Sequence, residues 1–169
     1  MEGEDILTAI AEISIAFAGF SGIVSVIGRD RSTQWSVTDR IRFWSMLEFG
    51  IAALFFSLLP IPLRHFGLNP DLVWAVSSLL LGGFIAIDTY FGYRRGRKIA
   101  YRADGFAKAM RVVTAAILAL LALNVARIGP GDGLAAYLCG LVYLLAIATS
   151  YFWRLLWFSN SPFSGSWSE

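Results

Sequence analysis

Residues 6–28 of the chain, ILTAIAEISIAFAGFSGIVSVIG, decide its fold class. The stretch exceeds the ~20 apolar residues that a helix needs to cross a bilayer. It nevertheless carries Glu12, and hydrocarbon stabilises neither a carboxylate nor bare glycines that face lipid. We therefore expect a transmembrane helix that is packed inside a helical assembly.

The rest of the chain has the same character. Its 169 residues are 57% hydrophobic and 15% charged, with a mean hydropathy of +0.63. No polar stretch is long enough to fold separately, so we expect one all-α integral membrane domain over residues 1–158 and a weakly ordered cytoplasmic tail over 159–169. Window length predicts five transmembrane helices, at about residues 6–28, 43–63, 72–93, 112–128 and 134–158.

Turn chemistry sets the predicted boundaries of these helices. Pro60 and Pro62 lack N–H donors, so the second helix is expected to end there. Asn69 and Pro70 have the residue types of an N-cap and a first helical position, and they predict the start of the third helix. The GPGDG turn at residues 129–133 makes the fourth and fifth spans an antiparallel hairpin.

Lysine and arginine concentrate in alternate links. Residues 29–42 and 94–111 are strongly basic, whereas the remaining links carry only Arg64 and Arg127. Short basic loops stay in the cytoplasm, so we predict a multi-pass protein of the plasma (inner) membrane, with its N-terminus outside and its C-terminus inside. The acidic start MEGED is unlike a signal peptide, and no cleavage is expected.

Three carboxylates fall inside the predicted spans: Glu12, Glu48 and Asp88. A charged acid at mid-bilayer costs on the order of 2.5–3.5 kcal/mol, which makes a functional role the first hypothesis. By depth, Glu12 is expected to share an outer polar layer with Asn124 and Arg127, whereas Glu48 and Asp88 belong to an inner layer. These five residues form either a pathway for ions or a set of structural hydrogen bonds and ion pairs.

Small residues recur at helical spacing in the first and third spans. Such faces let helices approach closely, either within one chain or between copies in a homo-oligomer. The predicted packing or oligomer face comprises Ser14, Ala18, Gly19, Ser21, Gly22 and Ser25 in the first span and Ser78, Gly82 and Gly92 in the third.

The basic segment after the third span is suited to anionic headgroups, with ~1 kcal/mol for each cation near the surface. It also determines topology, and that role alone would explain it. No nucleic-acid-binding module accompanies it, so no nucleic-acid partner is expected. The predicted lipid contacts are Arg94, Arg95, Arg97, Lys98 and Arg102.

Signals for enzyme chemistry are nearly absent from the sequence. His65 is the single histidine, Cys139 is the single cysteine, and no zinc-protease, nucleophile-elbow or phosphate-loop motif is present. We expect no enzyme activity, no cofactor and no metal site.

Two functions remain for a protein of this class. The leading hypothesis is a homo-oligomeric channel or permeation unit for cations or protons, because carboxylates lie on helices with small-residue faces. The alternative is a non-catalytic subunit or scaffold that assembles with a larger membrane complex. The bilayer is the common partner in both.

Overall fold

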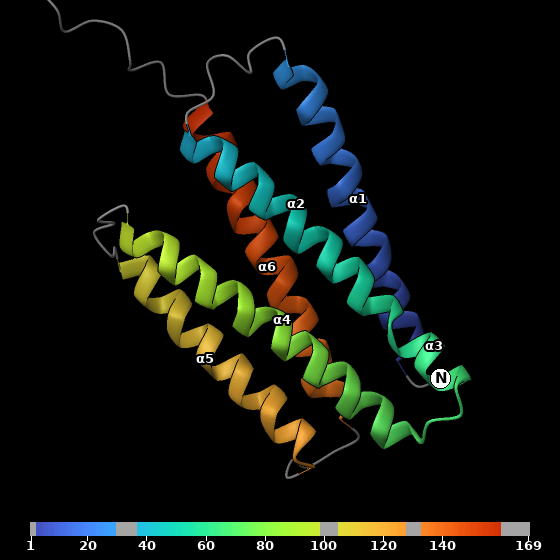
Figure 1. Cartoon of the computed structure of the whole chain (residues 1–169). Helices are drawn as coiled ribbons and strands as arrows, with labels where there is room; N and C mark the ends of the chain where they lie inside the picture. Colours follow the sequence, from blue (N-terminus) through green and yellow to red (C-terminus); the bar gives the residue numbers. More distant parts are fainter. Residues whose placement is uncertain (1–2, 30–36, 99–104, 128–132, 160–169) are drawn as a thin grey trace, which may run out of the picture.

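The computed structural model describes residues 3–29, 37–98, 105–127 and 133–159. The described part is an all-α bundle, as predicted from the sequence. Its helices run up and down beside one another (Figure 1). They are α1 (Glu4–Arg29), α2 (Val37–Leu58), α3 (Pro60–His65), α4 (Pro70–Lys98), α5 (Gly105–Val125) and α6 (Leu134–Ser159).

Helix α6 is the central helix of the bundle. It contacts α1 and α2 on one side and α4 and α5 on the other. Its buried positions Tyr137, Leu141, Leu144 and Ala148 recur at spacings of four, three and four residues, and each is fully buried. Such a 3–4 spacing keeps the side chains on one stripe of a helix. The C-terminal helix, rather than the N-terminal one, is therefore the centre of the core.

Length and composition match the membrane prediction. Four described segments are long and apolar enough to span a membrane: Glu4–Ile23, Arg40–His65, Pro70–Arg94 and Leu134–Arg154. The fifth, Ala109–Val125, is a shorter apolar helix. The expected fourth span is thus a helix, and it is shorter than the four spanning segments.

The second helix ends just before the two prolines, as predicted, and the structure adds a short helix that follows it directly. Helix α2 ends at Leu58, but Pro60 opens α3 directly afterwards, and the apolar segment continues to His65. Proline is compatible with the first turn of a helix, whose N–H groups have no intrahelical acceptor. The two prolines are therefore accommodated at the start of α3.

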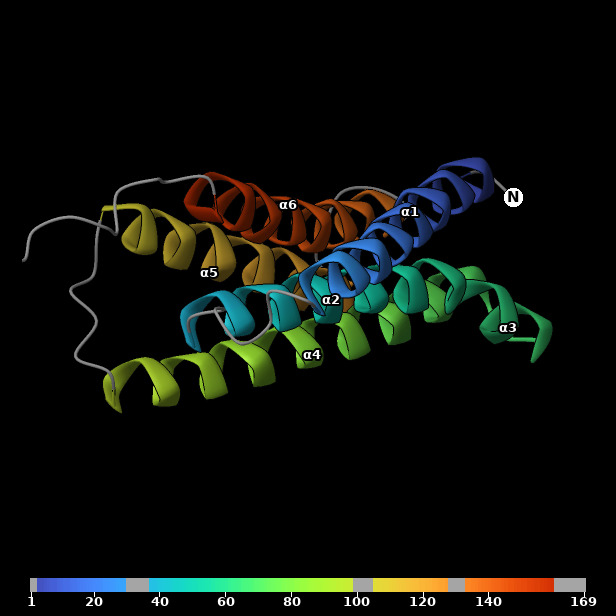
Figure 2. The same ribbon diagram turned by 90° about the horizontal axis from the view of Figure 1, so that it is seen from above.

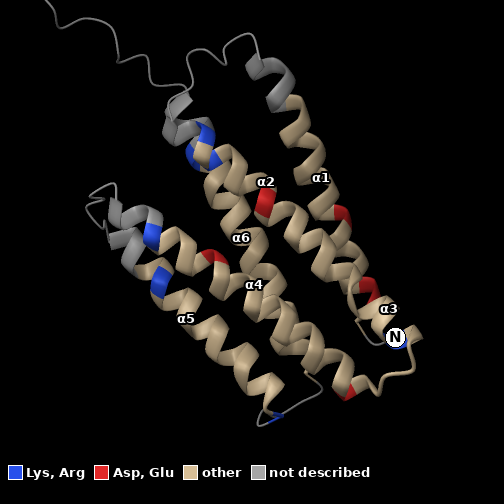
Figure 3. Ribbon diagram, viewed as in Figure 1, with Lys and Arg blue, Asp and Glu red and all other residues tan. Residues whose placement is uncertain are grey.

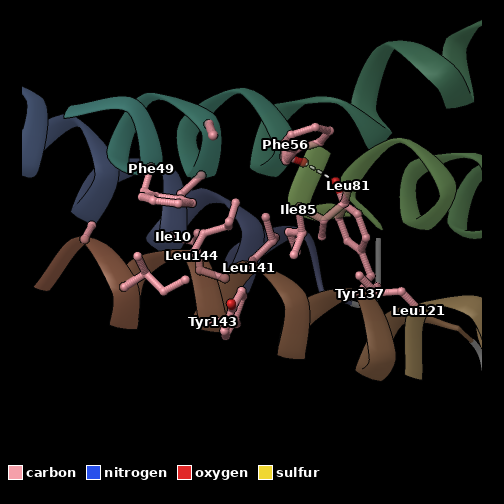
Figure 4. Packing of buried hydrophobic residues seen from close by; sticks show 14 of the residues in the cluster. Ile10, Phe49, Phe56, Leu81, Ile85, Leu121, Tyr137, Leu141, Tyr143 and Leu144 are labelled. Atoms are coloured by element: carbon pink, nitrogen blue, oxygen red, sulfur yellow. Dashed lines mark hydrogen bonds between the residues drawn. The ribbon is translucent and has the colours of Figure 1, made fainter. Parts of the chain in front are cut away.

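Tyr137 of α6 donates the hydrogen bond that the backbone of Pro60 cannot donate. In a continuous helix the Phe56 carbonyl would accept from the N–H of residue 60, which proline lacks. The Tyr137 hydroxyl donates to this carbonyl instead, at 2.5 Å (Figure 4). Ser77 lies beside the same phenol, but its buried hydroxyl makes no hydrogen bond of acceptable geometry within the described part.

Aromatic rings join the two sides of the core in the middle of the bundle. Phe84 of α4 contacts both Phe49 and Phe56 of α2, with ring centroids 6.3 and 5.7 Å apart. Phe49 also stacks on Tyr151 of α6, at 6.1 Å. Figure 4 shows Phe49, Phe56, Leu81 and Leu144 gathered between α2, α4 and α6. The interior of the single chain is thus filled by apolar side chains.

Helix α1 lies at the edge of the bundle, against the expectation that it is packed inside. It runs along α2 and touches α6 only lightly (Figures 1 and 2). Only 28% of its apolar window is buried, compared with 39–44% for the other three spanning segments. Its buried stripe includes Leu7, Ile10, Ser14 and Ser21. The remainder of its surface has no cover from the described chain.

Candidate functional site

Two carboxylates of the spanning helices point away from the packed interior. Glu12 on α1 and Glu48 on α2 are both exposed. Neither makes a hydrogen bond or an ion pair with any residue that the structure describes. Glu12 lies about 12 Å along the helix from Glu4, at 1.5 Å per residue, well inside the apolar segment. Within the described residues, these two acids are carboxylates of spanning helices that have no partner.

Asp88 has a different environment. It is half-buried on α4, and its carboxyl group is close enough to Tyr143 of α6 for an electrostatic interaction. It takes part in further interactions within the chain. Figure 3 shows the acidic residues on different helices rather than in one cluster. Asp88 therefore belongs to the interior of the bundle, whereas Glu12 and Glu48 belong to its outer surface.

Beside Asp88 lies a short chain of hydrogen bonds with a defined direction. Thr114 of α5 donates to the carbonyl of Met110 at 2.8 Å, and its oxygen lies 2.5 Å from the Tyr143 hydroxyl. A threonine hydroxyl has one hydrogen, so Tyr143 is the donor to Thr114. Both side chains are more than nine-tenths buried. Tyr143 is not among the site residues predicted from the sequence, because a tyrosine in an apolar run has no distinctive local signal.

The outer polar layer expected from the sequence does not form. Asn124 donates to Ser78 Oγ at 2.7 Å and to the Gly133 carbonyl at 2.9 Å, which ties α5 to α4 and to the start of α6. Arg127 is exposed beyond the end of α5, with a positive φ of 57°. Helices α1 and α5 lie on opposite sides of the bundle (Figure 1), so Glu12 is remote from both residues. Equal depth in the membrane did not imply contact.

Serine and glycine have separate roles on the small-residue face of α1. Ser14 and Ser21 are buried and donate to the carbonyls of Ile10 and Phe17, both at 2.7 Å. Ala18 is half-buried, whereas a Cβ added at Gly19 or Gly22 would meet no atom within 4 Å. The Ser25 side chain lies outside the described residues. One part of the predicted face therefore packs within the chain, and the glycines do not.

The small residues of α4 divide in the same way. Ser78 is buried and bonded to Asn124, and a Cβ at Gly82 would lie 3.7 Å from Leu121 of α5. Gly92 is exposed, with no atom within 4 Å of an added Cβ. A closer approach, absent from the sequence prediction, occurs at Gly140 of α6, where an added Cβ would lie 2.7 Å from Leu81.

The basic side chains gather mainly at one end of the bundle. Arg40 and Arg42 lie near the start of α2, Arg94 near the end of α4 and Arg111 near the start of α5 (Figure 3). The Arg94 guanidinium lies over the Tyr90 ring, 5.1 Å from its centroid. The predicted lipid contacts at Arg95, Arg97, Lys98 and Arg102 fall where side chains are not described.

The described residues contain no group of three or more histidine, cysteine, aspartate or glutamate side chains that could hold a metal ion. Comparison with protein families, with curated proteins and with solved structures gives no match to this chain. Its distinctive features are two outward carboxylates, an apolar interior and a basic end.

Proposed function

We propose that the chain is one subunit of a homo-oligomer that conducts cations or protons across the plasma (inner) membrane. The observation that carries this proposal is the outward position of Glu12 and Glu48, which have no partner among the described residues. An ionised carboxylate is unstable against hydrocarbon, so contact with water or with another protein subunit is favoured. Carboxylates that line a hydrated path also attract cations.

The packing of the interior favours a path between copies over a path within one chain. The centre of the bundle is filled by aliphatic and aromatic side chains of α2, α4 and α6. Asn124, Thr114 and Tyr137 are already committed to hydrogen bonds between helices. A conducting path through this core would have to break those contacts, whereas a path along α1 and α2 would not.

The orientation follows from the charges. Because the helices run up and down, Arg40, Arg42, Arg94 and Arg111 share the end at which α1 and α6 finish. By the positive-inside rule, this end faces the cytoplasm and the N-terminus lies outside. The same basic end, with Arg94 supported on Tyr90, would contact the headgroups of anionic lipids.

Ion flux into liposomes that contain the purified protein tests this proposal. We expect Glu12→Gln and Glu48→Gln each to reduce flux at least severalfold, because a neutral amide attracts cations less strongly than a carboxylate does. Asp88→Asn tests whether the inner acid contributes. Asp71→Asn is the matched control, because Asp71 is exposed in the first turn of α4. An oligomeric protein that gives no flux above empty liposomes would rule the function out.

The same two carboxylates also support a second candidate, a non-catalytic subunit of a larger membrane complex. A cation on another protein would satisfy Glu48 on α2, where Trp44 and Phe55 are exposed at 61% and 59% on the same side of the helix. Purification from native membranes distinguishes the two. A permeation unit is expected as a symmetric assembly of this chain alone, whereas a subunit is expected to copurify with a different protein in fixed ratio.

A further inference from the structure

Two arginines lie where the start of α2 packs on the end of α6. At this place Phe43 and Met46 of α2 are buried against aromatic side chains of α6, Tyr151 among them. Arg42 precedes Met46 by four residues, and both arginines, Arg42 and Arg154, are half-buried. Arg154 follows Tyr151 by three residues. Because helical side chains three and four residues apart share a face, the two arginines extend the packed stripes of α2 and α6 toward the basic end of the bundle.

This pair differs from the exposed arginines of the same end, which are Arg40, Arg94 and Arg111. Two half-buried cations at one end of a helix interface repel each other more strongly than two cations in water, and an anion beside both of them offsets this repulsion. Glu48 does not supply that anion, because it lies six residues further along α2 on a different face of the helix. Arg42 and Arg154 take part in other interactions within the chain, but the five N–H donors of a guanidinium group can serve more than one acceptor.

Exposed aromatic rings surround the arginine pair. Trp44 and Trp153, close to the two arginines in sequence, are 61% and 62% exposed. Tryptophan is the side chain that favours the boundary between headgroups and acyl chains. Phe20 of α1 is 45% exposed and packs edge-on against Phe152 of α6, with ring centroids 5.1 Å apart. A ligand with both a charged headgroup and apolar chains would satisfy the arginines and cover these rings.

We propose that Arg42 and Arg154 bind the phosphate of one anionic phospholipid at the corner formed by α2 and α6, with Trp44 and Trp153 beside the start of its acyl chains. The planar fork of each guanidinium group matches two phosphate oxygens, which gives the site geometric specificity in addition to charge. A zwitterionic lipid carries its own cation and offsets the arginine charges less. This site is on the other side of α6 from the headgroup contacts expected after α4, and it does not depend on ion conduction.

Native mass spectrometry of the full chain, titrated with phosphatidylglycerol or phosphatidylcholine, tests the site. We expect the double variant Arg42→Gln, Arg154→Gln to bind phosphatidylglycerol about tenfold more weakly or worse, because each cation near a lipid surface contributes about fivefold in affinity. Its affinity for phosphatidylcholine should change by less than about threefold, since that headgroup has no net charge.

Two control variants remove the same amount of charge. Arg64→Gln with Arg127→Gln changes two exposed arginines near the opposite end of the bundle, and Arg94→Gln with Arg111→Gln changes two exposed arginines of the basic end. Each pair should lower phosphatidylglycerol affinity by less than about threefold, because exposed charges are solvated and screened by salt. An equal loss for the Arg94 and Arg111 pair would show a diffuse basic surface and overturn the defined site.

The lysine variant separates geometry from charge. Arg42→Lys with Arg154→Lys keeps both cations but removes both forks, so phosphatidylglycerol affinity should fall at least about threefold. Helical circular dichroism and thermal unfolding show whether this variant and the glutamine variant are folded. Unchanged affinity of a folded lysine variant would reduce the site to charge alone and overturn the bidentate phosphate contact.

Brominated lipids report where the lipid sits. Brominated phosphatidylglycerol should quench tryptophan fluorescence more than brominated phosphatidylcholine, and Trp44→Phe with Trp153→Phe should remove most of that difference. A difference that survives both substitutions would overturn the placement at this corner. Inorganic phosphate is the probe for a free anion: binding as tight as that of the lipid, and lost in the Arg42→Gln, Arg154→Gln variant, would overturn the lipid as the ligand.

Discussion

At the scale of single residues, the same chemical group has different consequences on different faces. Ser14 and Ser21 are buried and satisfied by carbonyls of their own helix, so they cost little in an apolar contact. Glu12, on the opposite face, has no such local acceptor or donor among the described residues. Tyr137 shows a third case, in which a remote hydroxyl satisfies a carbonyl that a proline leaves free.

Removal of the Tyr137 hydroxyl should therefore destabilise the bundle. We expect Tyr137→Phe to lower the free energy of unfolding by about 1–3 kcal/mol, because the buried Phe56 carbonyl would lose its donor. Reversible unfolding in mixed micelles measures this change. Tyr90→Phe is the control, with an expected change below about 0.5 kcal/mol, because Tyr90 is exposed. Equal stability of both variants would show that the Phe56 carbonyl finds another donor.

At the scale of helices, close approach is decided by a few positions. Gly140 is buried against Leu81 and Leu121, and it lets α6 reach both α4 and α5. At the start of α6, Gly133 has a φ of +70°, and an added Cβ would lie 2.8 Å from Asn124 Oδ1. These glycines set the packing of the α4–α5–α6 half of the bundle.

A larger side chain at Gly140 should separate these helices. We expect Gly140→Leu to lower the free energy of unfolding by about 1–3 kcal/mol, the usual effect of overpacking. Gly83→Leu on α4 is the matched control, because an added Cβ there meets nothing within 4 Å. Thermal unfolding of the detergent-solubilised proteins compares them, and an equally stable Gly140→Leu variant would mean that Leu81 moves aside at little cost.

At the scale of the whole molecule, α6 divides the bundle into an α1–α2 side and an α4–α5 side. Side-chain hydrogen bonds join α6 to α5 and to α2, whereas α1 packs along one stripe only. Among the four spanning segments, the one with the smallest buried share thus carries Glu12, a carboxylate without a partner among the described residues. We therefore expect the functional residues on the outer surface of the bundle and not in its core.

Topology is the whole-molecule property that a labelling experiment reads directly. In a Cys139→Ser background, Phe66→Cys should react with a membrane-impermeant thiol reagent from outside intact cells, because Phe66 is 82% exposed between α3 and α4. Arg97→Cys should react only after the cells are permeabilised. The reverse pattern would place the basic end outside and invert the orientation.

The sequence by itself determined the helical class, the five apolar segments and the alternation of basic links. Length, hydropathy and charge are local properties of the chain, so they can be read without coordinates. The tertiary structure decided which face of each helix is covered. It moved α1 from the expected interior to the edge, separated Glu12 from Asn124 and Arg127, and joined Tyr143 to Thr114. The depth of a residue in the membrane follows from its position along the chain. Its contacts depend on how its helix is rotated and on which helices surround it. Packing between distant parts of the chain sets the rotation and the neighbours.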